Sequence, residues 1–206
     1  MWSHLVRETQ GEGTVEFDFT VRHRVARLAM QADPMALGAQ GLKSFLANRS
    51  DFRKLLTAKS GFALFALFPQ QEDLQRLYLS WLEAAGLSER KLHALTTAMD
   101  DIELVEVDFL RLYGIDIKDW FAGLLSSRRV ALLVLDLLER PETRIGAKAY
   151  GLASPLTKNE MMVATSVAAN TEEKRPHALL VTQEQLDARA EQLAKQRRIQ
   201  ARGLSA

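Results

Sequence analysis

The sequence predicts an all-helical fold, a multi-helix bundle with one short N-terminal strand or extended arm. Two observations predict it. First, 47% of the 206 residues are hydrophobic, which is enough to bury a core in one or two domains. Second, apolar residues recur at helical spacing along most of the chain, and helix-capping residues separate the runs. Both features are clearest in residues 107–141.

The N-terminal region carries the one strand signal. Residues 1–13 end in Gly-Glu-Gly and are expected to form a flexible arm, and residues 14–21 alternate apolar and polar side chains as a half-buried strand does. We find no second strand of equal quality nearby. The strand is therefore expected to pair with another subunit, or to lead as an extended segment into a helix. From Arg22 the spacing predicts a helix that ends at Asp33 and Pro34. The residues that share its apolar face are Val25, Leu28 and Ala29.

Short elements are expected next. Residues 36–48 and 50–59 are predicted as two short helices, the second capped by Ser50. Residues 61–68, GFALFALF, are apolar and bounded by Gly61 and Pro69, and their periodicity fits a buried helix or a buried strand. We expect them to lie in the core, because an exposed segment of this kind would be an apolar surface patch of the sort that binds partners.

Two amphipathic helices complete the first module. Residues 70–85 form the cleaner of the two, and Gly86 is expected to end it. Ser88 is expected to cap the other, which runs as far as Asp100. A domain boundary is predicted at this point, between an N-terminal helical module of residues 14–101 and a C-terminal helical module of residues 102–175.

The run from 107 to 141 predicts three helices. Gly114 should end the first after Tyr113, because glycine adopts the left-handed conformation without a side-chain penalty. Asp116 should accept amide hydrogens of a short helix that carries Trp120. Ser126 or Ser127 caps the third helix, which Pro141 ends. Leucine, alanine and valine occupy most faces of this third helix, so it is expected to be enclosed on several sides.

The C-terminal third is predicted as a connection followed by helices. Residues 141–155 look irregular, and Thr157 with Glu160 forms a capping box that opens a helix. Met161 and Met162 lie on that helix, where they serve either the core or an adaptable binding surface. Residues 176–206 are expected to form a projecting polar helix or tail, with Arg197 and Arg198 in its basic second half.

Composition bounds the class of function. The 27 basic and 26 acidic residues give a net charge of +1, so no global attraction to nucleic acid or to an anionic membrane is expected. There is no cysteine, no signal peptide pattern and no apolar run long enough to span a bilayer, which fits a soluble cytoplasmic protein. The four histidines are scattered and no catalytic or nucleotide-binding motif occurs, so no enzyme, cofactor or metal site is expected. Asp116 and Asp119 fit a helix cap better than a metal pair.

Two arginines at the start of the third helix need an explanation. Arg128 and Arg129 lie in its first turn, where positive charge opposes the helix dipole. Two kinds of compensating group are open. One is an internal carboxylate, and the other is an acidic groove on a partner protein. The internal candidates are Asp116, Asp119 and Asp136.

The same region resembles a known family. The order YGID, an acidic residue and then LSSRR at the start of an apolar helix is similar to tail assembly chaperones of siphophages that infect actinobacteria. The residues that carry the resemblance are Tyr113, Gly114, Ile115, Asp116, Asp119, Leu125, Ser126, Ser127, Arg128 and Arg129. The chain departs from the family at Leu156, where members often have tryptophan, and in its tail, and residues before Asp100 have no counterpart in it.

The resemblance implies a non-catalytic protein of the host cytoplasm. Such a chaperone coats the helical tape-measure protein and delivers it to tail-tube subunits, and self-association is left open. The residues expected to contact a partner are Tyr113, Asp116, Trp120, Arg128, Arg129, Met161, Met162, Arg197 and Arg198. Two other classes stay open. One is a small helical DNA-associated protein that uses the basic residues 22–27 and the terminal helix, and the other is a neck or connector subunit of a virion.

Overall fold

The computed structural model describes residues 13–157 and, beyond them, residues 159, 160, 162, 163, 166, 184, 187, 188 and 191. The chain divides into two units, residues 1–135 and 136–206, and each is described by itself. The boundary predicted near Asp101 lies inside the first unit. The expected N-terminal arm, except Gly13, and most of the expected C-terminal helix lie outside the described residues.

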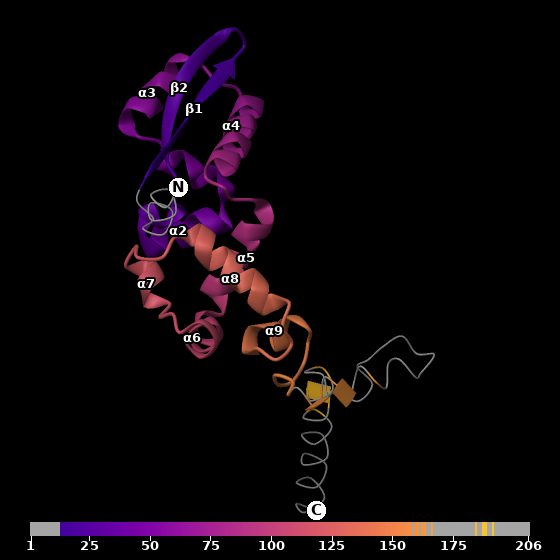
Figure 1. Ribbon diagram of the computed structural model, residues 1–206. Coiled ribbons are helices and arrows are strands. Elements are labelled where there is room, and N and C mark those ends of the chain that lie inside the picture. The colour runs from indigo at the N-terminus through magenta and orange to yellow at the C-terminus, as the bar shows by residue number, and fades with distance from the viewer. Residues whose placement is uncertain are drawn as a thin grey trace, which may run out of the picture. The chain divides into compact units, whose positions relative to one another are not determined.

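The first unit is mostly helical, with one β-hairpin at its start (Figure 1). Its strands and first helical elements are β1 (Thr14–Val21), β2 (Arg24–Gln31), the 3-10 helix η1 (Pro34–Leu37), α2 (Gly38–Ala47), the 3-10 helix η2 (Arg49–Leu55), α3 (Ala58–Ala66) and α4 (Gln71–Ala84). They are followed by α5 (Glu89–Asp100), α6 (Ile102–Asp108), the π-helical turn η3 (Phe109–Tyr113), α7 (Lys118–Phe121) and α8 (Ser127–Leu138), which runs into the second unit.

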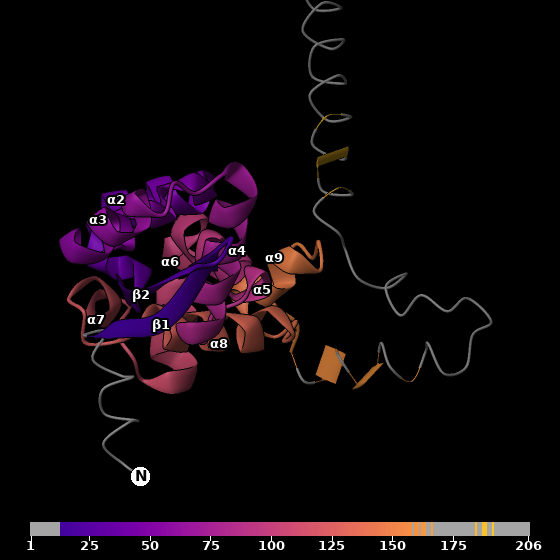
Figure 2. The ribbon, with the colours of Figure 1, turned by 90° about the horizontal axis from the view of Figure 1, so that it is seen from above.

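The predicted strand is confirmed as β1, but the expected helix from Arg22 to Pro34 is wrong. Most of that segment is β2, which pairs antiparallel with β1 from Thr14↔Gln31 to Val21↔Arg24 (Figure 2). The two strands are joined by a turn at Arg22 and His23, in which Arg22 has φ 56°. The partner of β1 is thus the next segment of the same chain. Pairing β1 overrode the helical spacing, because a single strand cannot satisfy its backbone groups alone.

The side chains of β2 follow the strand period. Leu28 and Met30 are buried, whereas Val25, which was expected on the apolar face of a helix, is 63% exposed. The outer edge of β2 is bonded to the start of α3, since Ala29 N donates to Ser60 Oγ at 2.7 Å and Thr57 N donates to Ala29 O at 3.1 Å. The sheet therefore holds α3 in place directly.

The elements from 34 to 66 agree with the prediction in part. Helical segments are present, but residues 49–55 form a 3-10 helix and Asn48 caps it, its Oδ1 accepting from Ser50 N at 3.2 Å. The apolar segment 61–68 belongs largely to helix α3, which settles its open assignment. The chain leaves this helix through Phe68, whose φ of 51° is left-handed.

The two amphipathic helices are confirmed as α4 and α5. Gln70 and Asp73 form a reciprocal capping box at the start of α4, and Gln70 N donates to Asp73 Oδ2 at 2.8 Å. Gly86, with φ 65°, follows the end of α4 as predicted. Ser88 caps α5 by accepting from Lys91 N at 3.3 Å.

The helix ends predicted between 107 and 141 are also confirmed. Gly114 is left-handed at φ 65° after η3, and Asp116 Oδ1 accepts from Lys118 N at 2.8 Å at the start of α7. Ser126 Oγ accepts from Arg129 N at 3.2 Å at the start of α8. The expected enclosure of α8 holds on one face only, because Val130, Ala131, Val134 and Leu137 are buried while Leu132 is 44% exposed.

One buried polar network ties the hairpin region to α8. The Asp33 carboxylate is 6% exposed and accepts from Ser127 N at 2.7 Å, from Ser127 Oγ at 2.5 Å and from Met35 N at 2.8 Å. Trp120 Nε1 donates to Ser127 Oγ at 2.9 Å. Asp33 thus places negative charge at the N-terminus of α8, where the helix dipole favours it.

The second unit contains a helix where an irregular connection was expected. It is α9 (Arg144–Ala149), and Thr143 caps it by accepting from Gly146 N at 2.9 Å. A Cβ on Gly146 would lie 2.0 Å from Arg140 O, so only glycine fits this turn. The capping box predicted from Thr157 and Glu160 is confirmed, with Thr157 N donating to Glu160 Oε2 at 2.7 Å.

Candidate functional site: an apolar groove between α3 and α4

Three phenylalanines stand exposed along α3 and just after it. Phe62, Phe65 and Phe68 are 79%, 74% and 64% exposed, and we name them the aromatic ridge. Phe62 and Phe65 are three residues apart on α3 and so lie on one side of it, and Phe68 follows just after the helix. The expected burial of residues 61–68 is therefore wrong for these three side chains. The inward face of α3 is filled instead by Ser60 and Leu64, which are buried.

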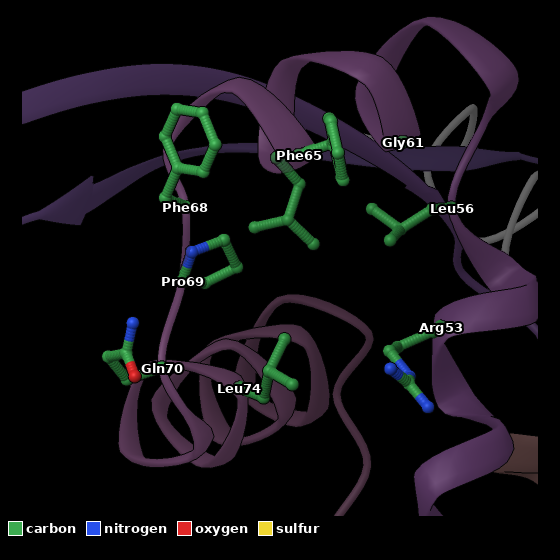
Figure 3. Close-up of a pocket in the computed structure, with 9 residues that line it drawn as sticks. Arg53, Leu56, Gly61, Phe65, Phe68, Pro69, Gln70 and Leu74 are labelled. Carbon is green, nitrogen blue, oxygen red and sulfur yellow. The ribbon is translucent and has the colours of Figure 1, made fainter.

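A groove of about 500 Å³ lies beside the ridge (Figure 3). Its lining residues are Arg53, Leu56, Gly61, Leu64, Phe65, Phe68, Pro69, Gln70 and Leu74. Figure 3 shows Leu74 on the helix that faces Phe65, with Pro69 and Gln70 in the link between the two helices and Arg53 at the other end. The walls are thus the outer side of α3, the end of η2 and the start of α4.

A second hollow of about 230 Å³ extends this groove along α4. Arg53 and Leu74 line both, so we treat the two as one apolar groove. The further lining residues are Arg49, Ser50, Phe52, Gln71, Gln75 and Tyr78. On α4 the lining positions 71, 74, 75 and 78 form a single helical stripe, which spans about 10 Å at 1.5 Å per residue.

Hydrogen bonds hold the far end of the groove. Tyr78 Oη donates to Glu89 Oε1 at 2.6 Å, and Arg49 Nε lies 3.7 Å from Glu89 Oε2. Burial, followed by the hydrogen bond to Glu89, raises the pKa of the Tyr78 hydroxyl above its usual range. Tyr78 therefore stays a neutral donor at physiological pH, and its ring packs edge-on against Phe52 at 5.3 Å.

Carboxylates near the groove are bound by residues of this chain. Hydrogen bonds from Ser44 and Lys54 lower the pKa of Asp51. The Gln70 amide and Arg76 lower the pKa of Asp73. Both carboxylates are thus ionised at neutral pH and stabilise the groove walls.

Three of the residues predicted to contact a partner take part in interactions within the fold. Trp120 is fully buried, so contact with a partner would require this region to open. Asp116 is hydrogen-bonded at the start of α7, and Tyr113 Oη donates to Leu133 O at 3.5 Å. The groove does not include these residues.

The two arginines of α8 lie in different surroundings. Arg128 packs on Gly86, where a Cβ would lie 3.2 Å from Arg128 Nε, and its charge adds to burial in lowering the pKa of Lys91. Arg129 is exposed. Of the carboxylates considered as partners, Asp136 pairs with Arg140 at 3.0 Å. The carboxylate at this helix terminus is that of Asp33, which sequence reasoning missed because 94 residues separate it from Ser127.

The other four predicted contact residues lie beyond residue 135, outside the unit that contains the groove. Met162 is 70% exposed in the second unit. Met161, Arg197 and Arg198 lie outside the described residues. The ridge itself had a sequence signal, since an apolar run bounded by Gly61 and Pro69 was recognised as a binding patch if exposed. What the sequence lacked was the orientation of α3.

Within the described ranges, no group of three or more histidine, aspartate or glutamate side chains is placed to hold a metal ion. None of the helices described there is long and apolar enough to cross a membrane. Comparisons with protein-family models, with curated proteins and with solved structures found no match. The functional argument therefore depends on the groove and on the sequence resemblance.

Proposed function

We propose that the protein is a non-catalytic assembly chaperone that holds an apolar helix of another polypeptide in the groove between α3 and α4. The sequence resemblance suggests that this polypeptide is the tape-measure protein of a siphophage tail. The observation that supports the proposal most is the aromatic ridge, because three large exposed phenylalanines beside an apolar groove are typical of a surface that binds a partner.

The expected affinity fits a coating protein. Burying one phenylalanine side chain contributes about 1.5–3 kcal/mol, so the two ridge residues that line the groove, Phe65 and Phe68, contribute about 3–6 kcal/mol to binding. Association and side-chain ordering cost about 4–15 kcal/mol, which leaves one groove with weak affinity. Many copies on one long helical partner would still coat it, because neighbouring copies would add avidity. Weak contacts also permit release when tube subunits polymerise around the tape-measure protein.

In this proposal the chaperone acts in the host cytoplasm and meets two partners. The groove holds the tape-measure protein, and a different surface recruits a tail-tube subunit or another copy of the chain. A second apolar surface is available for that role, formed by exposed residues of η3, α7 and the segment after α7. They are Leu110, Leu112, Phe121 and Leu124.

A DNA-associated role is the second candidate, favoured by the exposed Arg22, His23 and Arg24 at the hairpin turn. The next arginine along β2, Arg27, pairs with Glu16 at 3.0 Å, which reduces the basic character of this strand. A salt titration separates the candidates. Binding driven by phosphates must weaken steeply as salt rises, whereas binding in the apolar groove must not.

Co-expression with the tape-measure protein tests the proposal. We expect the wild-type chain to keep that protein in the soluble fraction, and a variant with Phe62, Phe65 and Phe68 all changed to Ser to lose this effect. The matched control also replaces three exposed apolar residues by Ser, but away from the groove. These are Val25, Leu79 and Leu132. Equal solubility with and without the wild-type chain would refute the proposal.

A further inference from the structure

The groove is long enough to hold about two turns of a helix. Its α4 wall is a straight stripe about 10 Å long, which matches about two turns of a helix laid alongside it. Phe65 and Phe68 form the opposite wall at one end. A helix seated here would present apolar side chains at the spacing i, i+3, i+4 and i+7.

The charge of the groove is one-sided. Among its lining residues the charged ones are Arg49 and Arg53, and no carboxylate lines it. Arg49 is engaged within the chain, since Glu89 lies 3.7 Å away and its Nη1 donates to Phe45 O and Leu46 O. Arg53 is exposed and lies where the two hollows meet.

The carboxylates around the groove are bound by other residues of the chain, although Asp51 also offsets part of the Arg53 charge. Asp51 accepts from Ser44 and Lys54, Asp73 accepts from Gln70 N and pairs with Arg76, and Glu89 accepts from Tyr78. The Arg53 side chain carries five N–H donors in a planar fork that matches a carboxylate. One of them, Nε, reaches Ser50 O at 3.4 Å.

We infer that the occupant of the groove is an amphipathic helix of another polypeptide in which an aspartate or glutamate flanks the apolar stripe, and that this carboxylate pairs with Arg53. The inference rests on the proposed function and specifies its partner. A basic or uniformly apolar helix would leave Arg53 without such a partner in a groove whose remaining lining is apolar or neutral. Nucleic acid fits poorly, because most of the groove would present neutral side chains to the phosphates rather than a basic track.

The test uses the full-length protein and two labelled synthetic 14-residue helical peptides. Both carry the same Leu and Phe stripe. One has Glu at each end of the stripe and the other has Lys, so either orientation presents a charge to Arg53. Fluorescence anisotropy should show that the Glu peptide binds about fivefold more tightly, the size of one partly exposed ion pair.

Three variants sharpen the result. Arg53→Glu should reverse the order of the two peptides, and Arg53→Lys should keep the wild-type order. Lys43→Glu makes the same charge change on the exposed side of α2, outside the groove, and should leave the preference intact. Thermal unfolding of each variant verifies that the fold is kept.

The other outcomes each overturn the inference. In the first, the wild-type chain binds both peptides with equal affinity, and the variant with serine at the three ridge positions binds neither. That result would keep the groove as a helix-binding site but would show that Arg53 does not select the partner. Failure of either peptide to bind would contradict the proposed function as well. The wild-type chain could instead form dimers that the ridge variant does not form and that the peptides do not disrupt. In that case the occupant of the groove is a second copy of this chain.

Discussion

Helices α3 and α8 carry two apolar runs of similar sequence character and opposite fate. Both contain runs of large apolar side chains, GFALFALF in and just after α3 and VALLVLDLL in α8, and both were expected in the core. Helix α8 buries Val130, Ala131 and Val134. Helix α3 buries Ser60 and Leu64 and exposes the aromatic ridge.

The difference lies in what surrounds each helix. A buried hydrogen-bond network of Asp33, Ser127 and Trp120 fixes the start of α8. The apolar face of this helix therefore packs against the core. The start of α3 is fixed by Ser60 bonding to β2, which turns Ser60 and Leu64 inward and the phenylalanines outward. Hydrophobicity alone therefore does not decide burial, and an apolar face that the chain leaves exposed is the better candidate for binding.

The largest loss of folding stability is expected at Trp120, which packs at the start of α8, and it tests the contrast between the two helices. Trp120→Ala should destabilise the protein by about 3–5 kcal/mol, because it empties a fully buried site and removes a donor to Ser127. Phe65→Ala, the comparison, should change stability by less than about 1 kcal/mol, since that ring is 74% exposed. Urea unfolding measures both. Similar losses for the two variants would contradict the contrast.

A smaller loss is expected at Asp33. Asp33→Asn keeps the shape but weakens three charge-assisted hydrogen bonds, so about 2–3 kcal/mol of stability should be lost. Asp100→Asn, at the exposed end of α5, serves as the control and should have almost no effect. Chemical denaturation at neutral pH measures both variants. If Asp33→Asn proved as mild as its control, the network would not be what fixes α8.

The groove wall at the start of α4 should depend on pH. The pKa of Asp73 is lowered below 3.8 in the folded state, chiefly by the Gln70 amide and then by Arg76. Its stabilising effect is therefore complete above pH 3.8 and is lost as pH falls through the folded value. Denaturant unfolding at pH 7 and near pH 3 should show that the stability lost in Asp73→Asn relative to wild type is smaller at the lower pH. An equal difference at both pH values would argue against this role.

The smallest change in stability is expected at the aromatic ridge. Replacing Phe62, Phe65 and Phe68 by Ser should shift the free energy of unfolding by less than about 1 kcal/mol, because all three rings already face solvent. The same variant should bind the dye ANS less, since ANS reports exposed apolar surface. A large loss of stability would show that the ridge belongs to the core.

Local signals predicted much of the fold. Alternation predicted β1, amphipathic spacing predicted α4 and α5, and capping chemistry predicted the roles of Gly114 and Asp116. Each of these depends on residues a few positions apart. The strand β2 was missed because its apolar residues have helical spacing. Only its pairing with β1 makes this segment a strand.

The candidate site was predictable only in part. Residues 61–68 stood out as apolar, but their exposure depends on how Ser60 and Leu64 meet β2. The groove depends on bringing Arg53 and Tyr78 to one surface, which sequence spacing does not show. The sequence also did not indicate that the Trp120 indole N–H bonds to Ser127 in the interior.

The most direct test of the groove places a photo-activated cross-linking amino acid at position 65 of the full-length chain during phage tail assembly. Position 124, equally apolar and 64% exposed but outside the groove, is the control. We expect position 65 to cross-link to a helical segment of the tape-measure protein and position 124 not to do so. Cross-links to that protein from position 124 alone, or from neither position, would contradict the account.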